Sequence, residues 1–542
     1  MIYFFRTNAV WEGNEVALMN RKLRCLLCCG TALFGLMLAA CSPSQSVEGI
    51  PDETAAPTAA AAPESEPQQE PVVFRSGVSV LSDETALTLR IDADELVLLD
   101  AFPALASVDF TDSACYPEIA AWALAHPDVT VRYTVPLGDQ TIANDATDAV
   151  VSAVADVSAL ACLPSLESLT VTEPVTAEAV TALRETRPDL RLSYTVAVGD
   201  LTIPCDAAEA DATALSSAFA DALVEAIPVL PQLQRIKLSP DAGWTLDQAD
   251  ALQQAREGLL VDYPVSVFGV TFSLADEVVS FNGISLTNRV EKVRALLPYL
   301  RNVKRLDMEN CEIPDATMAQ LRSEFPNPKI VWRVQVGSYS CRTDSIMIRF
   351  SVNFDPRRLH DSDVGALKYC NEVRYLDLGH NLLTKMDFLR YMPDIEVLII
   401  AVGPITSIEG VETCKKLEYC EFLSGGVTDL TPLAACTELR HLNLSYNLIT
   451  DITPLYGLTK LERLWISRND IPKKQIEEIR RLLPDCEINT TAQNPTGEGW
   501  RSVVTKRFEV IYHPRYKLLR QQFCYDLGIF SYNEETRPVF DD

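Results

Sequence analysis

The stretch LRHLNLSYNLI, from Leu439 to Ile449, decides the fold of this chain. Its apolar residues follow the spacing L-x-x-L-x-L, and an asparagine and a final isoleucine come after them. The same pattern starts at four other positions, always 22 residues apart: Val373, Ile395, Leu417 and Leu461. Five copies in strict register indicate a structural repeat rather than a chance run of leucines.

Each copy consists of one short strand and a return segment, which together cannot bury their own apolar side. Stacking the copies makes a continuous core and aligns the strands into one parallel sheet. Asn381, Asn447 and Asn469 occupy the ninth position of their copies, and the resemblance of these copies to leucine-rich repeats implies an asparagine ladder that satisfies backbone groups of the turns. Gly403 and Gly425 replace the asparagine in two copies, so we expect this ladder to be interrupted there.

A sparser form of the pattern occurs upstream, with starts at Leu105, Leu166, Leu233 and Val303. A helical stretch such as AEAVTALRET follows each start, and a proline-led strand such as RPDLRLSYTV comes next. We predict a hairpin after these strands, with turns at Gly138-Asp139, Gly199-Asp200 and Ala275-Asp276. The N-terminal half is therefore predicted to be an array of four enlarged units, and a separate α/β domain is the alternative.

The repeats resemble those of bacterial leucine-rich-repeat proteins. The segments LDLGHN (376–381) and LERLW (461–465) are similar to uncharacterised proteins of this kind from gut Firmicutes, over roughly residues 325–525. The turns TDLTPL and TDITPL resemble the short 22-residue class found in internalins, and this resemblance implies return segments of 3₁₀ type. The family has no assigned activity, so the resemblance implies a fold and a location outside the cytoplasm.

The predicted fold class is α/β, a leucine-rich-repeat solenoid with an array of enlarged, diverged units in front of it. The last repeat leads into a helical stripe and the segments GEGWR and HPRYKLLRQQF, which we expect to cover the open end of the core. The predicted segments are a mis-assigned start (1–18), a signal peptide (19–40), a tether (41–74), the diverged long-repeat region (75–365), the leucine-rich-repeat domain (366–492) and a C-terminal cap and tail (493–542).

The N-terminal region indicates export and lipid attachment. Arg21, Lys22 and Arg24 precede the apolar run CLLCCGTALFGLMLAA, which is too short for a spanning helix and suits a signal peptide. The run ends in LAAC, which resembles the lipobox of bacterial lipoproteins and makes Cys41 the predicted lipidation site. The following stretch is rich in Pro, Ala, Ser and Glu, and such a composition predicts a disordered tether. We expect an extracytoplasmic protein attached to the membrane through its lipid anchor only.

The charge excludes one class of partner. The formal net charge is −28, and residues 41–364 contribute −26 of it. A long acidic region repels phosphate backbones, which argues against nucleic acid as a partner. Apart from this exclusion, the acidic charge indicates only a soluble, well-solvated surface.

The sequence offers no sign of catalysis. It contains no HExxH, phosphate-loop, G-x-G-x-x-G or G-x-S-x-G motif, so we predict no enzyme, no cofactor and no metal. Eleven cysteines follow Cys41 in the chain, and an exported protein makes disulfides an alternative for them. The 22-residue register instead places Cys370, Cys414 and Cys436 at equivalent core positions, and Cys420 at a core leucine position. We expect these four to pack as small hydrophobic residues.

The repeat strands also define a candidate binding surface. Because side chains alternate along a strand, residues two, four and six places after each start point to the concave face. An apolar and aromatic patch flanked by arginines stands there, which is typical of interaction hot spots. The candidate ligand-binding residues are Tyr375, Val397, Ile399, Tyr419, Glu421, Leu423, His441, Asn443, Tyr446, Arg463 and Trp465.

The sequence thus predicts a recognition module that binds a protein, or less readily a glycan, through an exposed concave face. If the patch is exposed, alanine at Trp465 or Tyr419 should change stability by no more than about 0.5 kcal/mol. An envelope or adhesion stalk is the alternative, and it would be favoured if the chain's own cap covers the patch. An enzyme hidden in residues 75–365 is the second alternative.

Overall fold

The computed structural model describes residues 71–351 and 357–540. The chain divides into two units, and all described residues belong to the second, compact unit, Gln69–Asp542. The predicted start, signal peptide, lipidation site at Cys41 and most of the tether lie outside the described residues. The predicted tether ends at residue 74, whereas Val72–Val73 already form strand β1, paired with β2 (Ser79–Val80), and Phe74 is buried.

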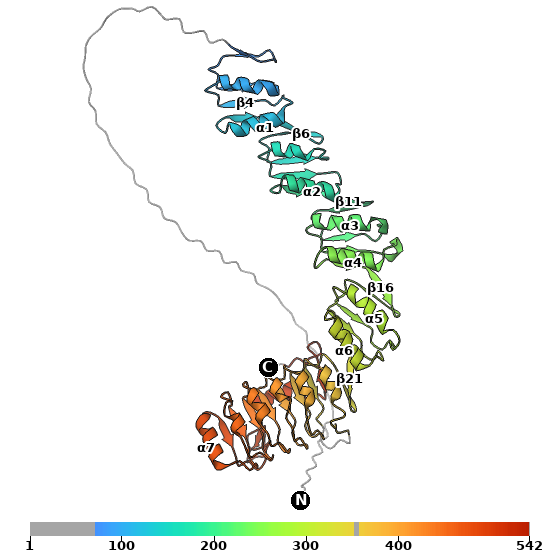
Figure 1. Ribbon diagram of the computed structural model, residues 1–542, viewed down its shortest axis with the longest axis vertical. Coiled ribbons are helices and arrows are strands. Elements are labelled where there is room, and N and C mark those ends of the chain that lie inside the picture. Colours follow the sequence, from blue (N-terminus) through green and yellow to red (C-terminus); the bar gives the residue numbers. More distant parts are fainter. Residues whose placement is uncertain (1–70, 352–356, 541–542) are drawn as a thin grey trace, which may run out of the picture. The chain divides into compact units, whose positions relative to one another are not determined.

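Four successive units of similar build come first (Figure 1), and each contains a three-stranded parallel sheet. The middle strand of each sheet is the repeat strand expected from the sequence. The strands are β3 (Ala86–Thr88), β4 (Ser107–Asp109), β5 (Thr130–Arg132), β8 (Asp148–Val151), β9 (Ser168–Val171), β10 (Arg191–Ser193), β13 (Glu209–Asp211), β14 (Arg235–Lys237), β15 (Leu260–Asp262), β18 (Val278–Ser280), β19 (Arg305–Asp307) and β20 (Lys329–Val331).

Helical segments connect the strands within each unit. The helix predicted from AEAVTALRET is α2, Ala177–Thr186, and Thr176 caps it by accepting the Ala179 N–H. The other helical segments are η1 (Ala93–Ala101), α1 (Tyr116–Ala125), η2 (Val157–Cys162), η3 (Ser217–Phe219), α3 (Ala220–Ala226), η4 (Ile227–Val229), η5 (Pro240–Ala242), α4 (Leu246–Ala255), α5 (Val290–Leu296), η6 (Leu297–Tyr299) and α6 (Asp315–Glu324).

A hairpin follows each unit: β6–β7 (Thr134–Leu137, Gln140–Ala143), β11–β12 (Thr195–Val198, Leu201–Pro204), β16–β17 (Pro264–Val267, Val270–Ser273) and β21–β22 (Arg333–Val336, Tyr339–Arg342). The turns predicted at Gly138-Asp139 and Gly199-Asp200 are confirmed. The turn predicted at Ala275-Asp276 is wrong, because the chain reverses at Phe268-Gly269. Both residues have positive φ, as a type I′ turn requires, and Gly269 adopts it without strain.

An eight-stranded sheet follows, which we call the repeat sheet. Its strands are β23 (Met347–Arg349), β24 (Tyr375–Asp377), β25 (Val397–Ile399), β26 (Tyr419–Glu421), β27 (His441–Asn443), β28 (Arg463–Trp465), β29 (Glu487–Asn489) and β32 (Ser531–Tyr532). Strands β24 to β28 are the five predicted copies and pair in parallel, each shifted by one 22-residue repeat. The predicted repeat register is therefore confirmed.

The asparagine ladder satisfies turn backbone groups as predicted. The Asn447 side chain accepts the Val427 N–H at 3.1 Å and donates to the carbonyls of Phe422 and Leu444. Asn381 and Asn469 make the same kind of contacts in their own repeats. Each side chain thus joins two neighbouring coils, because one amide serves both as donor and as acceptor.

The return segments are 3₁₀ helices, as the resemblance implies: η7 (Gly365–Tyr369), η8 (Asp387–Tyr391), η9 (Val411–Thr413), η10 (Thr431–Ala435) and η11 (Thr453–Leu455). Asp429 and Asp451 begin the last two of them by accepting the N–H groups of Thr431 and Thr453, both at 2.9 Å. These short hydrogen-bonded turns explain how a coil closes within 22 residues.

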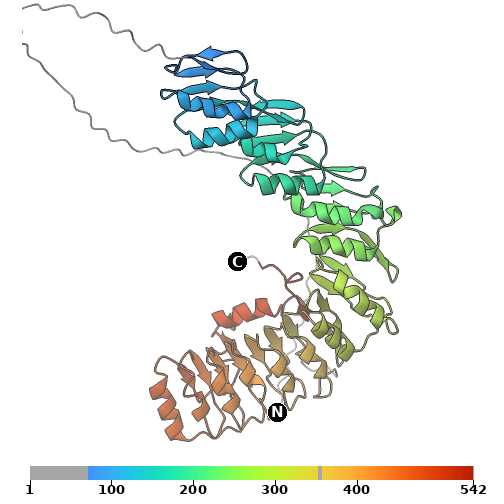
Figure 2. The same cartoon turned by 45° about the horizontal axis from the view of Figure 1, so that its top comes forward.

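One hydrophobic core runs from Phe74 to Leu483 through both kinds of unit. The enlarged units and the repeat sheet therefore belong to one solenoid, and a separate α/β domain is not needed to describe them. Helix α7 (Lys473–Leu482) and strand β29 end the array. The residues beyond them do not cover the open end of the core, contrary to the prediction. They turn back over the repeat sheet (Figure 2), as described below.

The core cysteines lead to a testable prediction. Cys370, Cys414, Cys420 and Cys436 are fully buried, and burial raises the pKa of Cys414 to about 11 and that of Cys436 to about 12. We expect all four to be free thiols, because a buried, protonated thiol is a poor nucleophile. A thiol reagent should reach them only after denaturation, without any reductant. The sulfur atoms of Cys341 and Cys370 lie 3.8 Å apart, so this pair gives the most direct test. If the thiol reagent reacts with the denatured protein only after a reductant is added, the prediction is refuted.

Candidate interaction site on the concave face

The predicted concave residues do lie side by side on one face of the repeat sheet. Strand register places Tyr419 next to His441 and Val397, and Glu421 next to Asn443 and Ile399. Trp465 follows Asn443 at the end of the same row. The alternation of side chains along each strand therefore predicted the face correctly.

The prediction that this face is exposed is wrong. Trp465 and Val397 are 0 % exposed and Tyr419 is 1 % exposed. The other predicted residues are buried as well, except the half-buried Tyr446: Tyr375, Ile399, Glu421, Leu423, His441, Asn443 and Arg463. Many of these side chains belong to a second hydrophobic cluster, separate from the solenoid core, which residues beyond β29 complete.

We call residues 490–540 the C-terminal segment. It contains the hairpin β30–β31 (Ser502–Val504, Val510–Tyr512), helix α8 (Pro514–Gln522) and strand β32. Strand β32 pairs antiparallel with β23, the first strand of the repeat sheet. The C-terminal segment therefore starts at the last strand of the sheet and ends at the first one, and it spans the concave face between them.

Trp500 is the central contact of the segment. Its ring centroid lies 5.6 Å from that of Tyr419 and 5.6 Å from that of Trp465. The Arg463 guanidinium stacks 4.7 Å from the Trp500 ring and donates to the carbonyls of Trp500 and Gly499. The aromatic patch predicted for a ligand is thus filled by an aromatic residue of the chain itself.

A buried ion pair lies beside Trp500. Glu421 is 0 % exposed and accepts hydrogen bonds from Trp500 Nε1 at 2.8 Å and Arg501 Nε at 3.0 Å, together with a second Arg501 nitrogen and the Tyr419 hydroxyl. Burial by itself would raise the pKa of Glu421, but the Arg501 charge and these donors hold it below its usual value. The carboxylate is therefore charged and depends on the segment for its compensation.

The far end of the segment is held by polar contacts too. The Tyr525 hydroxyl donates to Asp377 at 2.5 Å, and Asn533 donates to Asp344 at 2.9 Å. Arg349 donates to the Ile529 carbonyl. Phe523 and Leu519 of the segment fill the apolar space over these strands.

The contact leaves polar atoms of the concave face unsatisfied. Among the described residues, the buried atoms without a hydrogen-bond partner include Trp465 Nε1, Ser445 Oγ, Ser467 Oγ and His441 Nδ1. All four lie at outward positions of two adjacent repeats. Burial lowers the pKa of His441 to about 4, so its ring is neutral at pH 7. The segment pairs with other outward residues of these repeats, including Asn443 and Arg463, but it leaves these four atoms without a partner.

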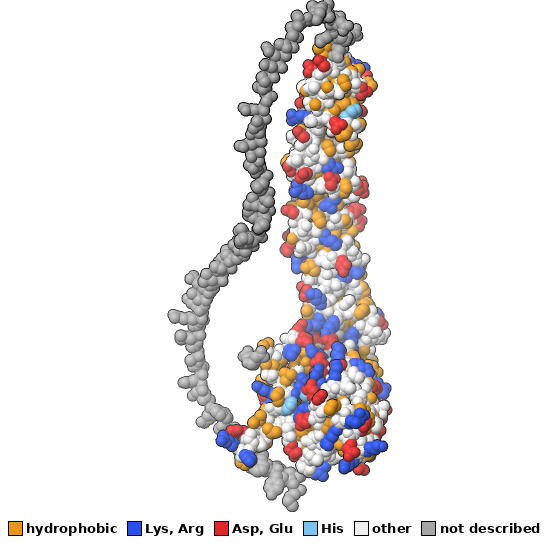
Figure 3. All heavy atoms as spheres, turned by 90° about the vertical axis from the view of Figure 1, so that its left-hand side faces the viewer, with side chains coloured by type: hydrophobic (Ala, Val, Ile, Leu, Met, Phe, Trp, Pro, Cys, Tyr) orange, Lys and Arg blue, Asp and Glu red, His pale blue; other side chains and the backbone are white. Residues whose placement is uncertain are grey.

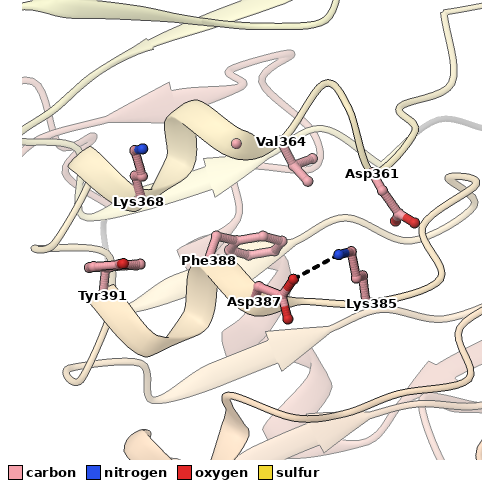
Figure 4. Close-up of a pocket in the computed structure, with 8 residues that line it drawn as sticks. Asp361, Val364, Lys368, Lys385, Asp387, Phe388 and Tyr391 are labelled. Carbon is pink, nitrogen blue, oxygen red and sulfur yellow. Dashed lines mark ion pairs between the residues drawn. The ribbon is translucent and has the colours of Figure 1, made fainter. Parts of the chain in front are cut away.

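A shallow pocket of about 250 Å³ lies elsewhere, between the return segments η7 and η8 (Figure 4). Lys385 and Asp387 in its lining already pair with each other at 3.0 Å, and Phe388 and Tyr391 supply an apolar wall. None of the residues that line it is a histidine or a cysteine. Within residues 71–351 and 357–540, no three His, Cys, Asp or Glu side chains are placed to hold a metal ion. The concave face is the stronger candidate.

Comparison with known proteins agrees with this architecture. The family model described as Leucine Rich repeats (2 copies) matches residues 437–480, which include strands β27 and β28. The chain carries leucine-rich repeats. With the strand pairing above, its fold is an α/β leucine-rich-repeat solenoid, as predicted. No catalytic family is indicated, and none of the curated proteins matches the sequence.

Solved bacterial leucine-rich-repeat structures are similar to the chain. An internalin from Listeria monocytogenes is 16 % identical, with a TM-score of 0.25, over 71 % of this chain and 92 % of that one. A leucine-rich-repeat protein from Leptospira interrogans is 15 % identical, with a TM-score of 0.23, over 74 % of this chain and 99 % of that one. Internalin C2 from Listeria monocytogenes is 17 % identical, with a TM-score of 0.21, over 28 % and 75 %.

Sequence reasoning gave coverage of the patch by the chain's own cap only as the alternative, and it did not identify the residues that make the contact. Trp500 and Arg501 stand in GEGWR, which was assigned to a cap over the end of the core. Their signal was present, since a tryptophan next to an arginine is a typical interface pair. Their partner, however, lies about 80 residues earlier in the chain, and no local pattern names it.

Proposed function

We propose that this chain is a non-catalytic recognition protein, and that the concave face of its leucine-rich repeats binds a protein ligand in place of the C-terminal segment. The supporting observation is the contact between this face and the segment. Tyr419, Trp465 and Trp500 form aromatic anchors around a desolvated Glu421–Arg501 pair, which is the composition of a binding hot spot. The face thus has the chemistry that recognises a polypeptide, and the segment is its intramolecular occupant.

The unsatisfied polar atoms favour a replaceable occupant. A buried donor or acceptor without a partner costs about 1–3 kcal/mol, and several occur together under the segment. A ligand that pairs with Trp465 Nε1 and the two serine hydroxyls would compete well with the segment. An apolar, aromatic face also suits a protein better than a glycan.

The proposed location is the extracytoplasmic side of the cell membrane, with a lipid on Cys41. This part of the proposal rests on the sequence alone, since Cys41 lies outside the described residues. None of the helices in the described part of the chain has the length and apolar character to cross a membrane. Labelled fatty acid should enter the wild-type protein and not Cys41→Ser; equal incorporation would remove the lipid anchor from the proposal.

Opening the face should increase ligand capture. Arg501→Glu places a second negative charge against the buried Glu421, so we expect the segment to leave the face. This variant should bind protein from cell-surface extracts that the wild type binds weakly. A synthetic peptide of residues 491–533 should compete with that binding, because it contains the natural occupant. Arg480→Glu, an equal charge change at an exposed position of α7, is the matched control.

The double variant Glu421→Arg with Arg501→Glu restores opposite charges and should return capture to the wild-type level. If the opened variant captures no more protein than Arg480→Glu does, the proposal fails. An architectural stalk then becomes the better description, and the same coverage of the concave face favours it as the second candidate. No observation favours an enzyme in residues 75–365.

A further inference from the structure

The hairpin β30–β31 contacts helix α8 through Tyr512, whose ring centroid lies 5.8 Å from that of Tyr516 and 4.6 Å from the Arg520 guanidinium carbon. Its two strands form a sheet of their own, with Ser502 opposite Tyr512 and Val504 opposite Val510. Neither outer edge pairs with another strand of the described chain. A lone two-stranded hairpin is at best marginally stable in water, so contacts beyond its own two strands must stabilise it.

Apolar side chains are exposed on both faces of this hairpin. Val503 and Ile511 lie on one face and are 42 % and 54 % exposed. Val504, Val510 and Tyr512 lie on the other face and are 64 %, 52 % and 40 % exposed. Along the enlarged units, acidic and basic side chains are scattered among hydrophobic and uncharged ones (Figure 3).

The tip of the hairpin carries the most exposed aromatic side chain among residues 71–351 and 357–540. Phe508 is 89 % exposed and has a φ of 62°, in the left-handed region. Thr505 builds the turn, because its hydroxyl accepts the N–H groups of Arg507 and Glu509. The Thr505 N–H also bonds to the Glu509 carbonyl, so residues 506–508 form a three-residue loop that Phe508 closes. Glycine is favoured at this left-handed position. A bulky aromatic held there at a cost in strain and exposed to water points to a contact outside the protein.

The hairpin and helix α8 together are basic in an acidic protein. Residues 500–523 contain six Lys or Arg and one Glu, whereas the whole chain has a net charge of −28. Lys506 and Arg507 at the tip, and Lys517 on α8, are exposed and form no ion pair with the described residues. The surface therefore combines free positive charge with exposed apolar and aromatic groups.

We propose that the hairpin β30–β31 is a binding site for the surface of an anionic lipid membrane. Phe508, Val504 and Val510 enter the boundary between headgroups and acyl chains, and Lys506 and Arg507 bind lipid phosphates. Three strand residues span about 10 Å, which matches the roughly 5–10 Å depth of interfacial insertion. This inference goes beyond the proposed function, because the concave face takes no part in it.

The two apolar faces decide between the possible occupants. Lipid surrounds an inserted hairpin on every side, whereas a protein docked on one face leaves the other in water. A second copy of the chain docked through this hairpin would bring two sets of the basic tip residues Lys506 and Arg507 near each other, and their repulsion disfavours such a dimer. An anionic membrane satisfies both the charge and the two-sided apolar surface.

Vesicle flotation tests the proposal. The compact unit 69–542 is used because it lacks the predicted signal and lipid. We expect it to float with vesicles of phosphatidylcholine and phosphatidylglycerol, more weakly at high salt, and poorly with phosphatidylcholine alone. Lys506→Ala with Arg507→Ala should lower the affinity by about twenty-fivefold, at about one fivefold step for each charge. Phe508→Gly should lower it by about tenfold or more.

Phe508→Gly is the decisive variant, because glycine suits the left-handed position and leaves the hairpin intact. Leu124→Ser, at a residue of α1 that is 86 % exposed, is the matched control and should float like the wild type. Absence of flotation, or equal flotation of Phe508→Gly and the wild type, would overturn the proposal. A dimer in sedimentation that Phe508→Gly abolishes, without vesicle binding, would assign the hairpin to a second copy instead.

Discussion

Arg501→Ala should destabilise the contact between the C-terminal segment and the repeat sheet by about 3–5 kcal/mol. The reason is that Glu421 stays buried and charged after its cationic partner is removed. Because the solenoid core does not include the segment, the loss should fall on the segment alone. Amide hydrogen exchange in α8 and β32 should accelerate by at least about a hundredfold, while exchange in β24 to β28 stays slow.

Two further variants test this explanation. Arg507→Ala removes an exposed arginine of the same segment and should change stability by no more than about 0.5 kcal/mol. Adding Glu421→Gln to Arg501→Ala removes the uncompensated charge and should recover part of the loss. If Arg501→Ala exchanges as slowly as Arg507→Ala, the ion pair does not hold the segment, and the proposed opening mechanism loses its basis.

The second large effect compares Leu442 with Trp465, two fully buried neighbours on opposite faces of the repeat sheet. Leu442→Ala should cost about 2–5 kcal/mol, because it leaves a cavity in the solenoid core. Trp465→Ala should cost about 3–5 kcal/mol, because its ring fills the cluster under Trp500. The small effect expected for an exposed tryptophan is therefore replaced by a large one.

The two substitutions should destabilise different parts of the protein. Leu442→Ala should lower the midpoint of global urea unfolding, whereas Trp465→Ala should first speed hydrogen exchange in the C-terminal segment. Tyr446→Ala, at a half-buried position of the neighbouring repeat, serves as a control with a smaller cost. A Trp465→Ala protein with wild-type stability and exchange would mean that the segment does not cover the face in solution.

Much of the fold was predictable because it is local. The 22-residue register places Val397, Tyr419 and His441 in one row without any knowledge of the rest of the chain. Asn447 follows the same rule, since its amide bonds to the neighbouring coils at a fixed offset. The turn at Phe268-Gly269 was not predicted, because Ala275-Asp276 was chosen for its likeness to the Gly-Asp turns of the other hairpins. Gly269 itself was a signal of the turn, since glycine adopts the positive φ found there without strain.

What the sequence determined by itself is the repeat, its register and the face to which each strand residue points, because neighbouring coils repeat the same short-range contacts. What only the tertiary structure decided is whether that face meets water. Trp500 and Arg501 reach Glu421 across about 80 residues, and β32 pairs with β23 although they are far apart in the sequence, with Tyr532 opposite Met347. Periodicity identifies the residues that share a surface, but a single non-repeating segment that folds back over them carries no period. The burial of the concave face therefore depends on contacts that no local pattern encodes.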